Sequence, residues 1–387
     1  MELGIKKHVE DIYKCTRCGY CREMVRERDN TFRICPIHEG TAGFEVYTGK
    51  GKMLLMRGVL EGTLEMTPRL AEIFFTCTTC GSCKAHCPVQ IDTVGIFEIF
   101  RKDLTARELS PAAHTMFGKH TTEKKNPYNE PHDQRTSWIP EDFEFSKPAE
   151  IAYFVGCTSS YRQKELAIAT FKILKKLGVD FTILGPDEWC CGSPLFRTGQ
   201  IKQATELAQH NIDKLTELGV KQILFSCAGC YRTFASDYPK IEKLKAKSMT
   251  FAKFISKKIK DGSLKLKNLP VTLTYHDACH MTRSVKKPDY KTPRKVLNAI
   301  PGVELVEMVS TLEGSMCCGA GGGVKSAFPE VAVSAAQNRV QQAKETGAVC
   351  LISTCPFCKR NLSDGNKEAN LGMKVMDLTE LILERIE

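Results

Sequence analysis

Glu188-Trp189-Cys190-Cys191-Gly192-Ser193-Pro194 is the stretch that decides the expected fold of this chain. Its two adjacent cysteines are too close together to serve separate metal sites, and they suit one site in which neighbouring sulfurs bind adjacent metal ions. Equivalent cysteines recur 122 to 128 residues later, which indicates two copies of one domain. The two frames are Cys157, Cys190, Cys191, Cys227 and Cys230, and then Cys279, Cys317, Cys318, Cys355 and Cys358.

The cysteine content favours metal sites over disulfides. The chain has 387 residues, of which 42% are hydrophobic and 19 are cysteine. Disulfide frameworks belong to secreted proteins, and the first eight residues contain no apolar stretch typical of a signal peptide. No run approaches the roughly 18 apolar residues that a membrane span needs. We therefore expect a cytoplasmic protein, soluble or bound by a partner at the cytoplasmic face of a membrane, whose cysteines bind metal.

The net charge of +10 is partly local. Residues 237–267 contain ten lysines and three acidic residues. Such a segment is either a solvated helix face or a docking site for an acidic partner or membrane surface. No basic motif interleaved with aromatic residues is present, so nucleic-acid binding is not expected.

Eight further cysteines lie in two runs near the N-terminus. The second run matches the C-x₂-C-x₂-C-x₃-C-P pattern of bacterial ferredoxins, in which the fourth cysteine binds the other of two [4Fe–4S] cubes. Thirteen residues, not three, precede the fourth cysteine of the first run. Zinc fits these triplets less well, because its sites use paired cysteine arms. The expected cubes are bound by Cys15, Cys18, Cys21 and Cys87, and by Cys77, Cys80, Cys83 and Cys35.

The segments around these runs read as helices. Residues 51–70 and 91–104 have helical apolar spacing, and no strand pattern is visible. A mainly helical ferredoxin domain is thus expected over residues 1–118. Residues 119–148 contain four prolines among polar residues, which predicts a linker or a strap across the surface.

Each repeated region alternates strands with amphipathic helices. Strands are predicted over 151–155, 179–183 and 220–225, and again over 271–275, 303–308 and 348–353. The frame cysteines follow these strands, and parallel sheets with right-handed crossovers place ligands at that one edge. The predicted fold is therefore an α+β multidomain protein, with α/β domains at 149–265 and 266–387 that contain parallel sheets.

Five other residues near the second frame need a separate interpretation. Cys350 lies inside a predicted strand and outside both frames, so we expect a buried small hydrophobe. Gly319, Gly321, Gly322 and Gly323 follow the second cysteine pair. They either let the backbone approach a cluster or substrate, or form a flexible turn.

Two histidines flank Cys279. His276 and His280 could each donate a hydrogen bond to a sulfide, bind metal, supply a proton to a thiolate product, or be structural. His280 is the preferred functional candidate because it lies beyond the strand, at the ligand edge.

The cysteine frames resemble the CCG domains of heterodisulfide reductase, and their fusion to a two-cube ferredoxin domain is similar to its D-type catalytic subunit. Residues 226–234 and 276–280 contribute much of this resemblance. It implies a non-cubane [4Fe–4S] cluster in each five-cysteine set, with a mixed disulfide of two anionic thiol coenzymes (CoM-S-S-CoB type) between them. Cys191, Cys318 and His280 are then the candidate catalytic residues. Spacing alone also permits a cube with a spare thiolate, or zinc.

The same architecture resembles the iron–sulfur subunits of flavin-linked lactate, glycolate and glycerol-3-phosphate dehydrogenases, which transfer electrons. Both five-cysteine sets are complete here, which favours disulfide chemistry. No G-x-G-x-x-G follows a predicted strand, so any flavin belongs to a partner. The expected partner is a membrane cytochrome b-type subunit or a flavoprotein.

Overall fold

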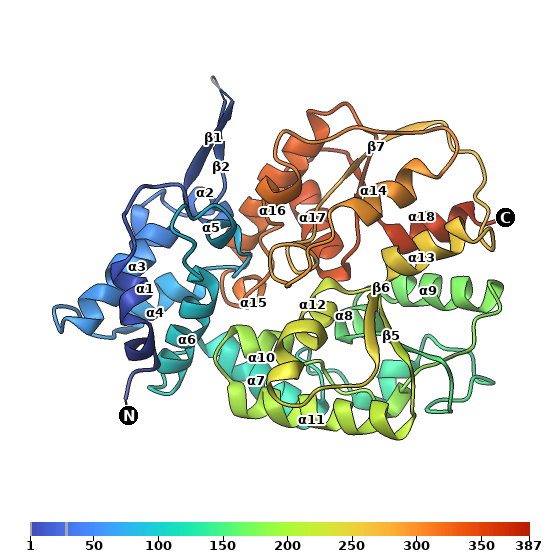
Figure 1. Cartoon of the computed structure of the whole chain (residues 1–387), viewed down its shortest axis with the longest axis horizontal. Coiled ribbons are helices and arrows are strands. Elements are labelled where there is room, and N and C mark those ends of the chain that lie inside the picture. Colours follow the sequence, from blue (N-terminus) through green and yellow to red (C-terminus); the bar gives the residue numbers. More distant parts are fainter. Residues whose placement is uncertain (1, 28–29) are drawn as a thin grey trace.

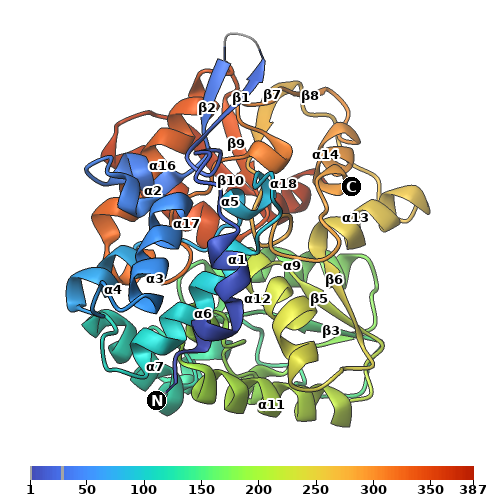
Figure 2. The same cartoon turned by 60° about the vertical axis from the view of Figure 1, so that its left-hand side comes forward.

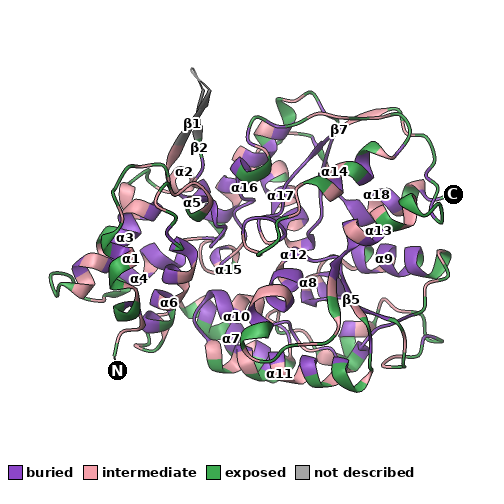
Figure 3. Ribbon diagram, in the orientation of Figure 1, coloured by how far each residue is buried: buried purple, intermediate pink, exposed green. Residues whose placement is uncertain are grey.

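The computed structural model describes residues 2–27 and 30–387, which form three packed regions (Figure 1). The N-terminal region, in blue, lies beside two α/β regions, which are green to yellow and orange to red. Buried residues concentrate along the strands and on the helix faces turned toward them (Figure 3). In the part of the chain that is described, no helix is both long and apolar enough to span a membrane.

The N-terminal region is mainly helical, as predicted. The segment predicted as one helix over 51–70 is two helices, because Gly62 has a positive φ of 73° and Pro68 begins a new helix capped by Thr67. The helices are α1 (Val9–Tyr13), α2 (Pro36–Gly40), α3 (Gly49–Leu60), α4 (Pro68–Phe75), α5 (Ser82–Ala85), α6 (Thr93–Thr105) and α7 (Ala112–Lys124).

A β-hairpin occupies the insertion between Cys21 and Cys35, where no strand was predicted. Strands β1 (Glu23–Glu27) and β2 (Asn30–Arg33) pair antiparallel and stand out from the region (Figure 1). The expectation was wrong because the insertion is rich in charged residues and lacks the apolar alternation that identifies a half-buried strand. Beside the hairpin, α2 packs against α16 (Pro329–Lys344) of the third region (Figure 2).

Each α/β region contains a four-stranded parallel sheet. All six predicted strands occur, and each sheet has an additional edge strand, β6 or β10. These edge strands begin with an exposed lysine and are half-exposed, so they lack a clear apolar run. The first sheet has the order β4 (Phe181–Thr182), β3 (Ile151–Phe154), β5 (Gln222–Phe225), β6 (Lys247–Thr250), and the second β10 (Lys374–Asp377), β9 (Cys350–Ser353), β7 (Val271–Tyr275), β8 (Val303–Leu305).

The last helix of each α/β region also packs against the other region. Helix α13 (Phe251–Lys260) packs on α14 (Lys291–Asn298) of the second region, and α18 (Leu378–Arg385) packs on α9 (Lys164–Lys176) of the first. One apolar cluster includes residues of both sheets, such as Tyr153 and Leu273. Packing therefore crosses the predicted boundary between residues 265 and 266, which stays a prediction. The remaining helices are α8 (Cys157–Tyr161), α10 (Ser193–Arg197), α11 (Ile201–Glu217), α12 (Ala228–Arg232), α15 (Val324–Ala327) and α17 (Pro356–Glu368).

The segment 119–148 is more than a surface strap. Helix α7 extends into it, and the side chain of Arg135 is only 2% exposed. Its Nη1 forms an ion pair of 2.7 Å with the buried Glu188, which precedes the first cysteine pair. A buried carboxylate needs such a cation, and this pairing attaches the segment to the cysteine site.

Candidate metal centres

Two small cavities in the N-terminal region are each lined by one of the predicted cube sets. The structure thus brings together the crossed sets expected from the sequence, including Cys35 from beyond the hairpin. Cys21 and Cys83 lie between the two cavities and line both. The first cavity is lined by Cys15, Cys18, Cys21 and Cys87, and the second by Cys35, Cys77, Cys80 and Cys83.

A buried lysine lies beside the second of these cavities. The side chain of Lys52 is 1% exposed, and its Nζ donates a hydrogen bond of 2.5 Å to the carbonyl of Tyr47. Burial lowers the pKa of Lys52, while the nearby thiols of Cys77 and Cys35 favour its charged form. Lys52 is thus a cation that can compensate thiolate charge. Sequence reasoning missed it, because a lysine in an amphipathic helix gives no signal of burial.

The five cysteines of the first frame are buried at the carboxyl ends of β3, β4 and β5. Arg135 Nη2 donates to the Sγ of Cys157 at 3.3 Å. Glu188, its ion-pair partner, also accepts hydrogen bonds from the backbone N–H groups of Val155 and Gly156, at 2.8 and 2.9 Å. The thiol of Cys190 and burial raise the pKa of Cys157 well above its usual value.

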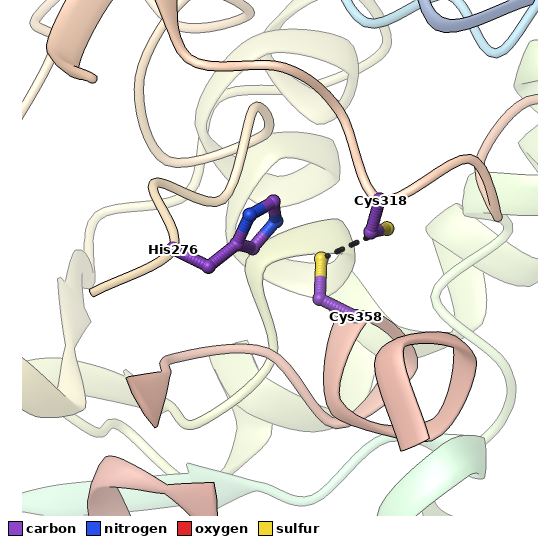
Figure 4. Close-up of side chains that lie close together, drawn as sticks. All are labelled: His276, Cys318 and Cys358. Carbon is purple, nitrogen blue, oxygen red and sulfur yellow. Dashed lines mark hydrogen bonds between the residues drawn. The ribbon is translucent and has the colours of Figure 1, made fainter. Parts of the chain in front are cut away.

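The second frame is equally buried and includes a histidine. The Sγ atoms of Cys318 and Cys358 are 3.4 Å apart, and those of Cys279 and Cys317 are 4.0 Å apart. His276 completes a group with Cys318 and Cys358 in which the ligand atoms all lie within 4.8 Å of one another (Figure 4). Of the two flanking histidines, His276 is the one that joins such a group among the described residues.

A single cavity of about 380 Å³ lies between the two α/β regions and is lined by all ten frame cysteines. Cys227 and Cys355 come from the two different frames, and the thiol of Cys227 lowers the pKa of Cys355 well below its usual value. The duplicated cysteine edges thus face a common space.

Basic side chains surround this cavity. Arg162 pairs with Glu130, Arg197 with Glu98 and Asp237, and Lys325 with Asp364. Arg360 also lines the cavity and has no carboxylate partner within the described part of the chain. Its guanidinium and that of Arg162 both lie over the ring of Tyr128, at 5.9 and 4.7 Å from the ring centroid. The cavity can therefore accommodate anionic groups.

His280 lines the same cavity. Nη1 of Arg232 donates a hydrogen bond of 3.1 Å to Nε2 of His280, so the imidazole proton lies on Nδ1. Burial and the cations Arg232 and Arg197 lower the pKa of His280 well below its usual value. The ring is thus a neutral hydrogen-bond donor rather than an acid.

The glycines after the second cysteine pair lie against the N-terminal region. A Cβ on Gly322, whose φ is +63°, would lie 2.5 Å from the carbonyl oxygen of Cys77, and one on Gly321 would lie 2.9 Å from that of Thr78. Gly321 and Gly322 also line the cavity, whereas Gly319 packs against α16. The close contact with residues 77–78 requires residues without side chains.

Two buried arginines stabilise the contact between these glycines and the N-terminal region by donating hydrogen bonds to backbone carbonyls. Arg101 is fully buried and donates to the carbonyls of Phe74, Cys77, Arg197 and Gly322, which belong to all three regions. Arg283 Nε donates to the carbonyl of Cys80 at 3.2 Å. The thiol of Cys317 raises the pKa of Cys80 well above its usual value, so the second N-terminal site adjoins the second frame.

The donor set fits iron–sulfur clusters. All nineteen cysteines are free thiols in the described structure, and eighteen of them line the three cavities. Buried thiolates in such numbers repel one another unless cations bind them, and soft thiolates select iron–sulfur clusters or zinc. Cys350 is the exception, since it is 3% exposed within β9 and packs in the apolar cluster that both sheets share.

Known protein families match the N-terminal region and the two α/β regions separately. The family model "Cysteine-rich domain", CCG, matches residues 151–235 and 273–363, and the model "4Fe-4S dicluster domain" matches residues 11–91. The chain is 38% identical to the D-type subunit of dihydromethanophenazine:CoB–CoM heterodisulfide reductase from Methanosarcina barkeri, over 96% of this chain and 93% of the relative.

Two more distant relatives also match most of the chain. The B-type subunit of fumarate reductase (CoM/CoB) from Methanothermobacter marburgensis is 33% identical over 80% of this chain and 61% of its own length. The EtfAB:quinone oxidoreductase of Syntrophomonas wolfei is 28% identical over 98% of this chain and 59% of its own length.

Proposed function

Because the chain belongs to the family of D-type heterodisulfide reductase subunits, we propose that it reduces a mixed disulfide of two anionic thiol coenzymes, of the CoM-S-S-CoB type, as the iron–sulfur catalytic subunit of a complex. The observation that carries this proposal is the single cavity of about 380 Å³ lined by the cysteines of both frames. A disulfide bound there contacts two cysteine sets at once.

The four cysteine sets hold two cubane [4Fe–4S] clusters in the N-terminal region and one non-cubane [4Fe–4S] cluster in each CCG domain. When bound, these clusters supply electrons one at a time and offer iron atoms to which sulfur can bind. The chain orders the sets spatially. Cys18 of the first set is exposed, Cys77 of the second set lies against Gly322 of the second α/β region, and the cysteines of both frames line one cavity. This order supports a route from the surface through the second frame to the first.

Cleavage of the disulfide bond consumes two electrons and two protons and yields two thiols. The cavity is lined by Cys191 of the first domain and by Cys318 of the second, and each is the second member of its cysteine pair. His280 presents a neutral imidazole to the substrate and orients a sulfur by hydrogen bonding. Arg360 binds an anionic end of the substrate, since no carboxylate of the described residues neutralises it. The glycines 321 and 322 keep the backbone close to the second N-terminal set.

The electron donor is a membrane cytochrome b-type subunit or a flavoprotein, and it docks where Cys18 is exposed. The chain then acts at the cytoplasmic face of the membrane or in the cytoplasm. The lysine-rich segment 237–267, which forms β6 and α13, is a second candidate contact with an acidic partner. Several of its lysines are exposed, among them Lys243, Lys245 and Lys257.

Iron analysis and a disulfide assay test the function together. Anaerobically purified protein is expected to contain about sixteen irons if each of four sets binds four. It is expected to oxidise a reduced viologen dye with CoM-S-S-CoB. About eight irons with two zincs would contradict the assignment of the CCG sites. A fully loaded protein that reduces no thiol-coenzyme disulfide, but transfers electrons from a flavoprotein, would show an electron-transfer subunit of a lactate, glycolate or glycerol-3-phosphate type dehydrogenase.

Substrate recognition has its own test. Arg360→Met is expected to raise KM for the disulfide roughly tenfold with little change in kcat, because one charge-assisted contact of about 1.4 kcal/mol is lost in ground state and transition state alike. Arg69→Met, on an exposed arginine of α4, is the matched control. An unchanged KM in Arg360→Met would exclude this arginine from substrate binding.

A further inference from the structure

His276 is a buried donor aimed at one cysteine site. It directly follows β7, is 1% exposed, and faces the sulfurs of Cys318 and Cys358 (Figure 4). Its Nε2 is buried and has no hydrogen-bond partner among the described residues. A buried polar atom without a partner costs free energy, which indicates that Nε2 meets a group bound between these sulfurs.

A buried arginine determines which ring nitrogen carries the proton. Nε of Arg339 donates a hydrogen bond of 3.2 Å to Nδ1 of His276. A guanidinium has only donors, so Nδ1 is the acceptor and the proton lies on Nε2. Arg339 is fully buried, and its other nitrogens donate to the carbonyl of Ser310 at 2.7 Å and to Oγ of Ser315 at 3.0 Å. These bonds fix the guanidinium and thereby the imidazole.

The first frame has no counterpart of this pair. Phe154 precedes Cys157 by three residues, as His276 precedes Cys279, and its ring packs against Phe225 and Phe234.

The preceding residues confirm this equivalence. The hydroxyl of Tyr153 bonds Ser226 at 2.9 Å, just before Cys227, and the hydroxyl of Tyr275 bonds Thr354 at 3.0 Å, just before Cys355. The residues at positions 154 and 276 therefore occupy the same place in the two domains.

The arginine is also replaced in the first domain. Ala204 packs on Gly192 as Ala332 packs on Gly319, which aligns Asn211 with Arg339. The amide of Asn211 donates to the backbone carbonyl of Cys190 at 3.2 Å instead of to a ring. The hydrogen-bond donor His276 and the arginine that orients it, Arg339, thus both belong to the second domain and are both replaced in the first.

We propose that His276 donates a hydrogen bond from Nε2 to a sulfur of the cluster site formed by the second frame, and that this bond makes the second site easier to reduce. The inference rests on the proposed function for the presence of a cluster there. Each added electron increases the negative charge of the site, and hydrogen bonds to the sulfurs stabilise that charge.

A redox titration of the full chain, loaded with iron and monitored by electron paramagnetic resonance, tests this without any disulfide. In His276→Leu, one centre is expected to become about tenfold harder to reduce by one electron, which corresponds to a potential about 59 mV lower. His276→Gln retains an N–H at similar reach and is expected to restore most of the shift. Iron content is expected to stay at the wild-type value in both variants.

Three outcomes would overturn the proposal: unchanged potentials in iron-loaded His276→Leu, a shift confined to the N-terminal cubes, or loss of iron, which would make His276 a ligand. If His276→Leu does not accumulate, His276→Phe, which introduces the residue of the first domain, decides by the same measurement. Lack of disulfide activity in the wild type would refute the proposed function but leave this titration interpretable.

Discussion

The two five-cysteine sites have matching ligand frames but different surroundings. At the first site, the buried ion pair of Arg135 and Glu188 contacts Cys157. At the second site, His276 is oriented by Arg339 and faces Cys318. One site is therefore bordered by a buried ion pair from the segment 119–148, and the other by a histidine and an arginine of its own domain.

Their positions also differ. The second site adjoins the N-terminal region through Cys317 and Cys80, and Gly322 packs on Cys77. The first site faces the second across the cavity that the cysteines of both frames line. Duplication thus reproduced the ligands, whereas contacts with other segments made the sites distinct.

The strongest test removes one cysteine from each site. Cys191→Ala and Cys318→Ala are each expected to abolish disulfide reduction with a dye donor, by more than roughly 100-fold, since even changes outside the ligand set cost 10–100-fold. The N-terminal cubes are expected to remain reducible. Activity and cube reduction are measured on the same samples. If either variant keeps its activity, the two sites are not both required.

A second test addresses the fixed charges at the first site. Arg135→Met leaves Glu188 buried without its cation, and we expect a loss of about 3–5 kcal/mol in the free energy of unfolding. Anaerobic urea unfolding measures it. The double variant Arg135→Met/Glu188→Gln is the control and is expected to recover part of the loss. Spectroscopic signals of the second site are expected to stay unchanged, and a change there would contradict the separation of the two environments.

Acidification tests the support of the second site. Nε2 of His114 donates to the carbonyl of Gly323 at 3.0 Å, and burial lowers the pKa of His114 to about 4. The pKa of His114 in the folded protein lies below the unfolded value of about 6.5. The contribution of neutral His114 to the free energy of unfolding is therefore fully present above pH 6.5 and is lost as the pH falls toward 4. Wild type is expected to lose about 1.4 kcal/mol between pH 7.5 and 5.5 from this group.

The matched variant is His114→Gln, which keeps an N–H donor but does not titrate. Its unfolding free energy is expected to fall less over the same pH range, by the contribution of His114. Equal slopes for the two proteins would show that His114 does not govern the acid sensitivity.

The smallest effect is expected at Cys350, which belongs to neither site. Cys350→Ala removes one buried sulfur from β9 and is expected to cost about 1 kcal/mol, with iron content unchanged. Metal analysis and urea unfolding measure the two quantities. Loss of iron from one cluster in this variant would mean that the cysteines are wrongly divided between the sites.

Much of this protein follows from its sequence alone. The spacing of eighteen cysteines predicted four sets and the crossed pairing of Cys35 and Cys87, because ligand spacing is a local property of loops that follow strands and helices. Strand periodicity predicted three strands of each sheet. The hairpin of β1 and β2 and the edge strands β6 and β10 were missed, since their sequences lack the apolar pattern that identifies a strand.

Only the tertiary structure decided what surrounds the cysteines. The sequence favours His280 over His276, whereas the structure places His276, which Arg339 orients, beside the sulfurs of Cys318 and Cys358. Lys52 became relevant only through its burial. Arg101 donates hydrogen bonds to the carbonyls of Cys77 and Gly322, and Gly322 lies 221 residues beyond Arg101 in the chain. Such effects depend on burial and on contacts between distant segments, and the spacing of residues along a chain contains no direct record of either.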